Sequence, residues 1–208
     1  MNLSTIRNII FDLGGVIIEL DVPATLTGLA LANRNTESQQ LSLDEEGVLL
    51  DYEKGLISSE AFRMGVRRAM ANPTLRDEKI DEIWNSMLLN IPSERLALVQ
   101  RLAQQYRLFV LSNTNEIHVT AFNKIVEQVS GQPSIDDFFE KVYFSHKIKM
   151  RKPDREIYEY VLSDSQLKPE ETLFLDDKAE NLLAAREVGI HTVQVTPQQD
   201  ILAIFADL

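Results

Sequence analysis

The chain contains no cysteine among its 208 residues. Without thiols it cannot form disulfides, thiolate metal sites or a cysteine nucleophile, and this composition fits a reducing compartment. Only three histidines are present, His118, His146 and His191, and they lie far apart in the sequence. A histidine-based zinc centre would require the fold to bring them together, so zinc is not the expected metal.

Positive charge is scarce as well. The 21 Lys and Arg residues face 32 Asp and Glu residues, which gives a formal net charge of −11 at pH 7. Affinity for nucleic acids comes largely from Lys and Arg that neutralise phosphates. We therefore expect no nucleic-acid partner.

Long hydrophobic runs are missing too. Apolar stretches such as Ile9–Phe11 and Val16–Ile18 end at charged residues or glycine, far short of the roughly 20 apolar residues that span a bilayer. The first seven residues lack the basic, apolar and small-residue pattern of a secretory signal. We expect no membrane association and a cytoplasmic location.

Five short apolar runs alternate with helical patterns, and this order is typical of a parallel α/β sheet. The runs are short and rich in Ile, Val, Leu and Phe, as in strands buried on both faces. They are Asn8–Phe11, Leu108–Leu111, Lys141–Phe144, Thr172–Leu175 and His191–Val195. The pattern predicts a three-layer, Rossmann-like α/β core domain formed by residues 1–20 and 91–208.

Residues 21–90 show helical patterns and no convincing strand. The expected helices are Thr25–Ala32, Leu41–Tyr52, Ser59–Met70 and Arg76–Leu89. Four helices in a segment of this length suggest a small bundle. We expect an inserted helical cap domain over residues 21–90 that closes over the strand ends.

Polar residues follow the apolar runs, where open parallel sheets bind their ligands. Asp12 follows the first run, ahead of Gly14 and Gly15, and the second run is followed by Ser112 and Asn113. A basic stretch, residues 146–154, follows the third run, and Asp176 and Asp177 follow the fourth. These side chains are the candidate functional site.

The three carboxylates of Asp12, Asp176 and Asp177 would lie close together if the strand ends are adjacent. Their mutual repulsion would raise at least one pKa, and a divalent cation would relieve it. A site built from oxygen donors favours Mg²⁺ over Zn²⁺. A cation, a lysine, a hydroxyl and a free carboxylate together suit phosphoryl transfer, in which the carboxylate can be the nucleophile.

The ordered motifs resemble those of the haloacid dehalogenase-like hydrolase superfamily. Four segments carry the resemblance, at positions 11–16, 111–114, 151–154 and 174–181. The helical insertion after the first strand is similar to the cap of that family's phosphatase branch. Within the branch, the chain is most similar to sugar-phosphate phosphatases and to the N-terminal phosphatase domain of soluble epoxide hydrolases.

The resemblance implies a role for each motif residue. Asp12 would be the nucleophile and a Mg²⁺ ligand, Ser112 would bind a phosphoryl oxygen, and Lys152 would balance the negative charge of both. Asn113 and Gly15 would belong to the phosphate-binding loops. The remaining implied residues are metal ligands or their support: Asp177, Asp176, the main chain of Gly14, and Asn181. The substrate would be a small phosphorylated metabolite such as a sugar phosphate, selected in part by the cap loop at residues 52–55.

One position departs from the family pattern. The residue two after the nucleophile is usually a second aspartate that acts as general acid and base, and here it is Gly14. Loss of a general acid costs roughly 10²–10⁴-fold in rate where the leaving group needs a proton. Glu19 or Asp21 could replace it from the adjacent segment.

Other interpretations stay open at this point. Ser112 and Asn113 could cap the following helix, Asp176 and Asp177 could stabilise a helix N-terminus, and Asn181 could be a surface residue. A 2-haloacid dehalogenase would also use an aspartate nucleophile, although it needs no metal and the paired acids argue against it. A weakened domain that binds a phosphometabolite or a protein is the other alternative, because of Gly14. A nicotinamide-dependent oxidoreductase is excluded by the lack of a third glycine in the required spacing.

Overall fold

The computed structural model describes residues 3–34 and 47–206. A parallel sheet of five strands, in the order β3-β2-β1-β4-β5, forms its centre. The strands are β1 (Asn8–Phe11), β2 (Arg107–Ser112), β3 (Lys141–Phe144), β4 (Thr172–Asp176) and β5 (His191–Gln194). The predicted α/β class is confirmed, and each strand end lies within one residue of the prediction.

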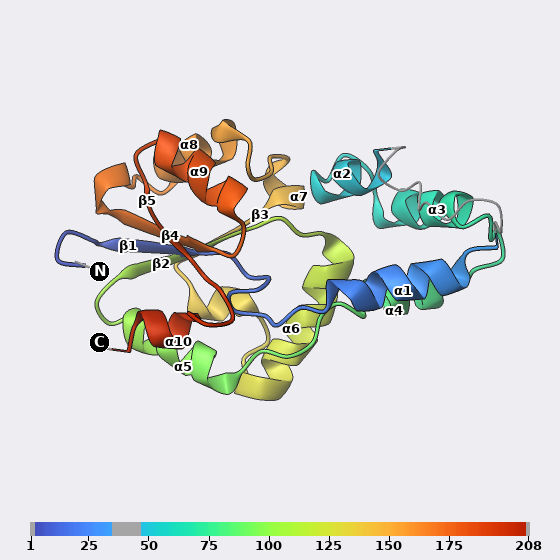
Figure 1. Cartoon of the computed structure of the whole chain (residues 1–208), viewed down its shortest axis with the longest axis horizontal. Helices are drawn as coiled ribbons and strands as arrows, with labels where there is room; N and C mark the ends of the chain where they lie inside the picture. The colour runs from blue at the N-terminus through green and yellow to red at the C-terminus, as the bar shows by residue number, and fades with distance from the viewer. Residues whose placement is uncertain (1–2, 35–46, 207–208) are drawn as a thin grey trace.

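Helices cover both faces of the sheet, so the core has three layers (Figure 1). One face carries α5 (Ser93–Leu102), α6 (Glu116–Ser130) and α10 (Ile201–Ile204), and the other carries α8 (Arg155–Asp164) and α9 (Ala179–Glu187). Shorter helical segments connect these elements: η1 (Ile135–Phe138), α7 (Ser145–Ile148) and η2 (Pro169–Glu171).

The two faces of the sheet form separate hydrophobic cores. Successive side chains of a strand point to opposite faces, and accordingly Ile9 and Phe11 of β1 pack in one core while Ile10 packs in the other. All four residues of β1 and all five of β4 are buried. This explains why both strands are continuous apolar runs in the sequence.

The inserted segment between β1 and α5 is helical, as expected. Its helices are α1 (Val22–Ala32), α2 (Val48–Glu53), α3 (Ser59–Ala69) and α4 (Asp77–Asn85). Part of the predicted helix Leu41–Tyr52 lies outside the described residues. The prediction that a helix continues to Leu89 is wrong, because Leu88 instead forms an antiparallel bridge with Leu20.

The chain enters and leaves this helical segment side by side. Glu19 N–H donates to Asn90 O at 2.8 Å, Leu89 N–H donates to Glu19 O at 3.0 Å, and Asp21 N–H donates to Met87 O at 2.8 Å. The predicted domain boundaries, at residues 20 and 91, stay a prediction. They lie where these two segments are joined by main-chain hydrogen bonds.

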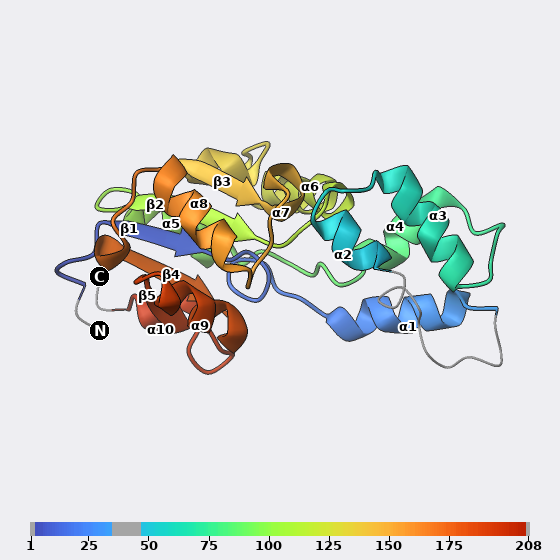
Figure 2. The same cartoon turned by 90° about the horizontal axis from the view of Figure 1, so that it is seen from above.

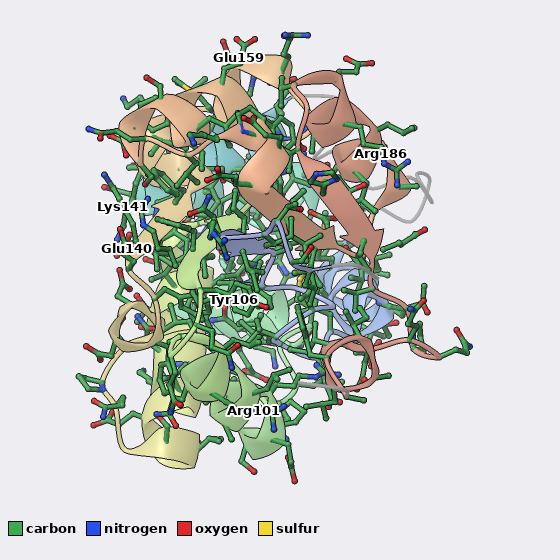
Figure 3. All side chains as sticks on the ribbon, turned by 90° about the vertical axis from the view of Figure 1, so that its left-hand side faces the viewer. Arg101, Tyr106, Glu140, Lys141, Glu159 and Arg186 are labelled. Atoms are coloured by element: carbon green, nitrogen blue, oxygen red, sulfur yellow. The ribbon has the colours of Figure 1, made fainter. Side chains whose placement is uncertain are left out.

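The strands end towards the inserted helices. In Figure 2 the arrowheads of β1 and β2 point to the lobe formed by α1 to α4. Figure 3 shows the opposite end of the sheet, where side chains such as Arg101, Glu159 and Arg186 point outward. The carboxyl ends of the strands therefore face the inserted helices, which places the candidate site between the two parts of the molecule.

No helix among residues 3–34 and 47–206 combines the length and the apolar composition needed to cross a membrane.

Candidate active site

Asp12 stands at the end of the central strand. Its N–H donates to Leu175 O at 2.8 Å, which extends the pairing of β1 with β4 by one residue. Its side chain is buried, and Oδ1 accepts a hydrogen bond from Leu13 N–H at 2.7 Å and pairs with Lys152 Nζ at 3.0 Å. Within the described part of the chain, Oδ2 has no hydrogen-bond partner.

Lys152 lies between two carboxylates. Its side chain is 1% exposed, and Nζ lies 3.0 Å from Asp12 Oδ1 and 2.7 Å from Asp176 Oδ2. Burial acts to lower the pKa of Lys152, but the two neighbouring carboxylates outweigh it and raise the pKa overall. The lysine is therefore a buried, permanent positive charge beside Asp12.

The main chain of Lys152 is held by Asn113 from the end of β2. Asn113 Oδ1 accepts a hydrogen bond from Lys152 N–H at 2.9 Å, and Asn113 Nδ2 donates to Lys152 O at 2.8 Å. This pair of bonds uses both polar atoms of the side-chain amide. Asn113 thus positions the lysine through its side chain, and its main-chain N–H makes no hydrogen bond within the described residues and can bind a ligand.

Asp176 and Asn181 form the support on the other side of the lysine. Asp176 is fully buried, and Asn181 Nδ2 lies 3.0 Å from both of its carboxylate oxygens. Lys178 N–H donates to Asp176 Oδ1 at 2.8 Å. Asn181 is itself 2% exposed, so the interpretation of this residue as a surface side chain is wrong.

The three acids form one cluster. Asp12, Asp176 and Asp177 each offer a carboxylate oxygen, and these atoms lie within 4.8 Å of one another. Burial raises the pKa of Asp12 to about 6, even though Lys152 acts against it. Burial and the adjacent Asp176 also raise the pKa of Asp177. The carboxylates are thus packed closely enough for a cation to stabilise them.

The donor set fits a magnesium ion. The cluster holds oxygen donors and neither histidine nor cysteine, as Mg²⁺ prefers. The main-chain carbonyl of Gly14 accepts no hydrogen bond from the described residues, so it is free to serve as a further oxygen ligand.

Gly15 shapes the cluster by its missing side chain. Its φ is +72°, and a Cβ built on it would lie 2.8 Å from Asp177 Oδ2. Glycine allows both this left-handed conformation and the close approach of the carboxylate. The Gly15 N–H already donates to Ile18 O at 2.8 Å, so its contribution in this structure is room for Asp177.

Ser112 completes the set predicted from the strand ends. Its side chain is buried, and its hydroxyl has no hydrogen-bond partner within residues 3–34 and 47–206. The cap of α6 is Asn115, whose Oδ1 accepts a hydrogen bond from His118 N–H. The interpretation of Ser112 and Asn113 as helix caps is therefore wrong.

Ser145 is a site residue that the sequence analysis missed. It is fully buried, its Oγ accepts a hydrogen bond from Thr114 N–H at 3.0 Å, and it donates to Glu53 O at 2.6 Å. It thereby ties the loop after β2 to the inserted helices. Its position directly after the third apolar run was a usable signal, because that is where the other site residues were found.

The loop at residues 52–55 is docked onto the core. Glu53 pairs with Arg151 and Lys54 pairs with Asp154, each at 3.1 Å. A Cβ on Gly55 would overlap the carbonyl of His146. Ionic and main-chain contacts thus place this loop against the segment that carries the buried lysine.

The fold and the site together place a buried lysine and an acidic cluster at the carboxyl edge of a parallel sheet. The family model for haloacid dehalogenase-like hydrolases matches residues 6–189. The chain belongs to this family.

Its relatives include characterised enzymes. The chain is 29% identical over 192 residues to a D-ribitol-5-phosphate phosphatase of Bacteroides thetaiotaomicron, covering 91% of each sequence. Over 61 residues, 29% of this chain, it is 38% identical to the bifunctional epoxide hydrolase 2 of Rattus norvegicus.

Solved structures agree with the sequence comparison. A haloacid dehalogenase family enzyme from Bacteroides thetaiotaomicron, in complex with magnesium and inorganic phosphate, is 36% identical and has a TM-score of 0.84, covering 96% of this chain and 99% of the other. A hydrolase of the same fold from Porphyromonas gingivalis is 33% identical, with a TM-score of 0.81 and coverage of 92% and 91%.

Proposed function

We propose that this hydrolase is a Mg²⁺-dependent phosphatase that removes the phosphoryl group of a small phosphorylated metabolite through an aspartyl-phosphate on Asp12. The observation that carries the proposal is the contact of the Asp12 carboxylate with the buried Lys152 Nζ, 3.0 Å away, inside a cluster of three acids. The bonding of Asp12 Oδ1 leaves Oδ2 as the oxygen that attacks phosphorus.

The transfer proceeds by exchange of two bonds to phosphorus. A bond forms between Asp12 Oδ2 and phosphorus while the bond from phosphorus to the leaving oxygen breaks, and water then hydrolyses the acyl phosphate to regenerate the carboxylate. Lys152 offsets the negative charge of the nucleophile and the phosphoryl group throughout. Because Asn113 and Asp176 hold the lysine at both ends, this charge needs little reorganisation during the reaction.

Asp12, Asp177 and the carbonyl of Gly14 would hold Mg²⁺. Asp176 would not bind the ion directly, because its carboxylate oxygens already accept hydrogen bonds from Asn181, Lys178 and Lys152. It would support the residues around the ion instead. When bound, the ion supplies charge neutralisation for the phosphoryl oxygens.

The phosphoryl oxygens would meet one hydroxyl and two main-chain donors. The Ser112 hydroxyl is free of partners in the described part of the chain, and so are the N–H groups of Gly14 and Asn113. Donors left unpaired at a strand end are suited to bind an oxyanion.

The substrate is expected to be a sugar or alditol phosphate. The match to a D-ribitol-5-phosphate phosphatase covers 91% of each sequence, and this supports a polyol as the leaving group. Gly14 places no carboxylate where the leaving oxygen would be protonated, so water is the expected source of that proton.

The test is phosphate release from a panel of sugar and alditol phosphates, acetyl phosphate and p-nitrophenyl phosphate, with Mg²⁺ or with EDTA. Release that depends on Mg²⁺ and is abolished by Asp12→Asn supports the proposal. Glu187→Gln is the matched control, because it neutralises one exposed acid at the far end of α9. This control is expected to keep full activity.

Two results would count against the proposed function. Chloride release from 2-chloropropionate without Mg²⁺ would indicate a dehalogenase. Thermal stabilisation by a sugar phosphate without any turnover would indicate a binding domain.

A further inference from the structure

A small cavity of about 70 Å³ adjoins the phosphoryl site. Gly14 and Ser112 form part of its wall, so the cavity borders residues that the proposed function assigns to the phosphoryl group. Leu20 also lines it, and a Cβ on Gly14 would lie 2.7 Å from Leu20 Cδ1. An apolar side chain thus fills part of the space in which a carboxylate at position 14 would stand.

His118 is the polar side chain on the α6 side of this cavity. The rest of the wall is mainly apolar, apart from Ser112, Asn113 and Thr114 of the loop after β2, and comprises Leu13, Ile18, Leu20, Met87, Leu88 and Phe122 together with Gly14. The histidine did not enter the proposed phosphoryl chemistry, and its sequence context gave no reason to single it out.

Two residues of α4 fix the His118 ring. Trp84 stacks on it with ring centres 5.1 Å apart and planes 13° apart, and Asn85 Oδ1 lies 3.0 Å from Nδ1. Trp84 Nε1 also donates to Asn115 Oδ1, which caps α6. The inserted helices thereby determine the orientation of a side chain that belongs to the core.

The bonding defines which ring nitrogen is free. With Asn85 Oδ1 as acceptor, Nδ1 carries the proton and Nε2 has a lone pair. Burial lowers the pKa of His118 to about 4, so the ring is neutral at physiological pH. Within the described residues, Nε2 has no hydrogen-bond partner, and it lies on the ring edge that does not contact Asn85.

We infer that His118 is a positioning and specificity residue whose Nε2 accepts a hydrogen bond from a hydroxyl of the leaving group, and that it selects polyol phosphates over phosphates without such a hydroxyl. The inference rests on the proposed function, and it assigns part of the enzyme's substrate selectivity to His118 Nε2. The cavity of about 70 Å³ can hold a hydroxyl-bearing carbon, and the neutral His118 imidazole is part of its wall.

Two substitutions separate this role from a structural one. Asparagine at position 118 can keep a donor near the Nδ1 position for Asn85 but has no group at Nε2, whereas glutamine can place an amide oxygen near Nε2. We would measure kcat and KM of wild type, His118→Asn and His118→Gln on the best polyol phosphate of the panel and on acetyl phosphate.

The expected result is a loss of kcat/KM on the polyol phosphate of about 10- to 100-fold in His118→Asn, as for a lost hydrogen bond to a buried group. The same variant should stay within about twofold of wild type on acetyl phosphate, and His118→Gln should recover much of the loss. Equal losses on both substrates, or a His118→Asn variant that equals wild type, would overturn the inference.

The proposed function and the inference fail in different ways. If the wild type releases phosphate from acetyl phosphate but from no polyol phosphate, the phosphatase stands and the role of His118 is refuted. If it releases phosphate from neither substrate, the proposed function fails, and the inference that rests on it fails as well.

Discussion

Asn181 offers the sharpest test of how the buried charges are held. It is 2% exposed, and its Nδ2 lies 3.0 Å from both oxygens of the fully buried Asp176. The Asn181→Ala change removes this donor, and a hydrogen bond to a charged group contributes about 1.5–3 kcal/mol. Alanine has a higher helix propensity than asparagine, which offsets about 0.5 kcal/mol of this loss in unfolding free energy. The expected net loss of unfolding free energy is about 1–2.5 kcal/mol.

The nearly isosteric Asn181→Asp change should cost more. It replaces the donor by a second carboxylate against Asp176, and two charges about 4 Å apart repel by about 4 kcal/mol at an effective dielectric constant of 20. One of the pair can escape this repulsion by taking up a proton, which costs about 4 kcal/mol at pH 7 for an ordinary aspartate. Both routes give about the same penalty, and the charged pair also loses the hydrogen bond, whereas a protonated carboxyl at position 181 can donate one to Asp176.

The penalty should depend on pH with a defined sign. The added acid has a pKa that is higher in the folded than in the unfolded state, so stability is lost as pH rises above its unfolded pKa. Between pH 7 and pH 5 the protonation cost falls by about 3 kcal/mol. The Asn181→Asp variant should therefore approach Asn181→Ala in stability at pH 5.

Urea unfolding followed by circular dichroism, in buffer with EDTA at pH 7 and pH 5, measures these differences. The expected order of stability at pH 7 is wild type, then Asn181→Ala, then Asn181→Asp. An Asn181→Asp variant as stable as Asn181→Ala at pH 7 would refute the view that the buried Asp176 anchors the lysine and needs a donor at position 181.

Two further predictions concern the neighbouring residues. Gly15→Ala should lower the unfolding free energy by about 1–2 kcal/mol through its left-handed φ, and it should weaken Mg²⁺ binding by displacing the Asp177 carboxylate; unchanged affinity in a calorimetric titration would contradict this. Burial lowers the pKa of His118 to about 4. As the pH falls below 6.5, the unfolded state therefore binds a proton that the native state does not bind. The free energy of unfolding should be about 2 kcal/mol lower at pH 5 for this reason. Urea unfolding of wild type and His118→Gln at pH 8 and pH 5 should show this loss in wild type alone, and an equal loss in both would argue against the buried neutral ring.

The strands of the sheet, and the polar residues at their carboxyl ends, could be predicted from residue order alone. Buried parallel strands must be apolar on both faces, so β1 and β4 stand out as continuous runs, and the residue after each run must lie at the ligand-binding edge. Asp12, Ser112 and Asp176 could be found in this way without any contact information. The glycine at position 14, where the family pattern has an aspartate, could also be identified from the sequence because only the residue type is compared.

The contacts of each polar side chain could not be predicted in this way, because they depend on the packing of distant elements. Asn113 is committed to the main chain of Lys152, 39 residues away, and Asn181 turns inward because the buried Asp176 needs a donor. Ser145 bonds to Glu53, 92 residues away. Such hydrogen bonds depend on how elements distant in sequence pack together, so local sequence patterns cannot predict them.

The environment of His118 is the clearest case. On the sequence it is one of three scattered histidines, and its significance comes from Trp84 and Asn85 on a helix inserted far upstream. Helical periodicity identified that helix, but the angle at which it meets α6 is set by packing between the two parts of the molecule. The orientation of the His118 ring is therefore a property of the folded chain.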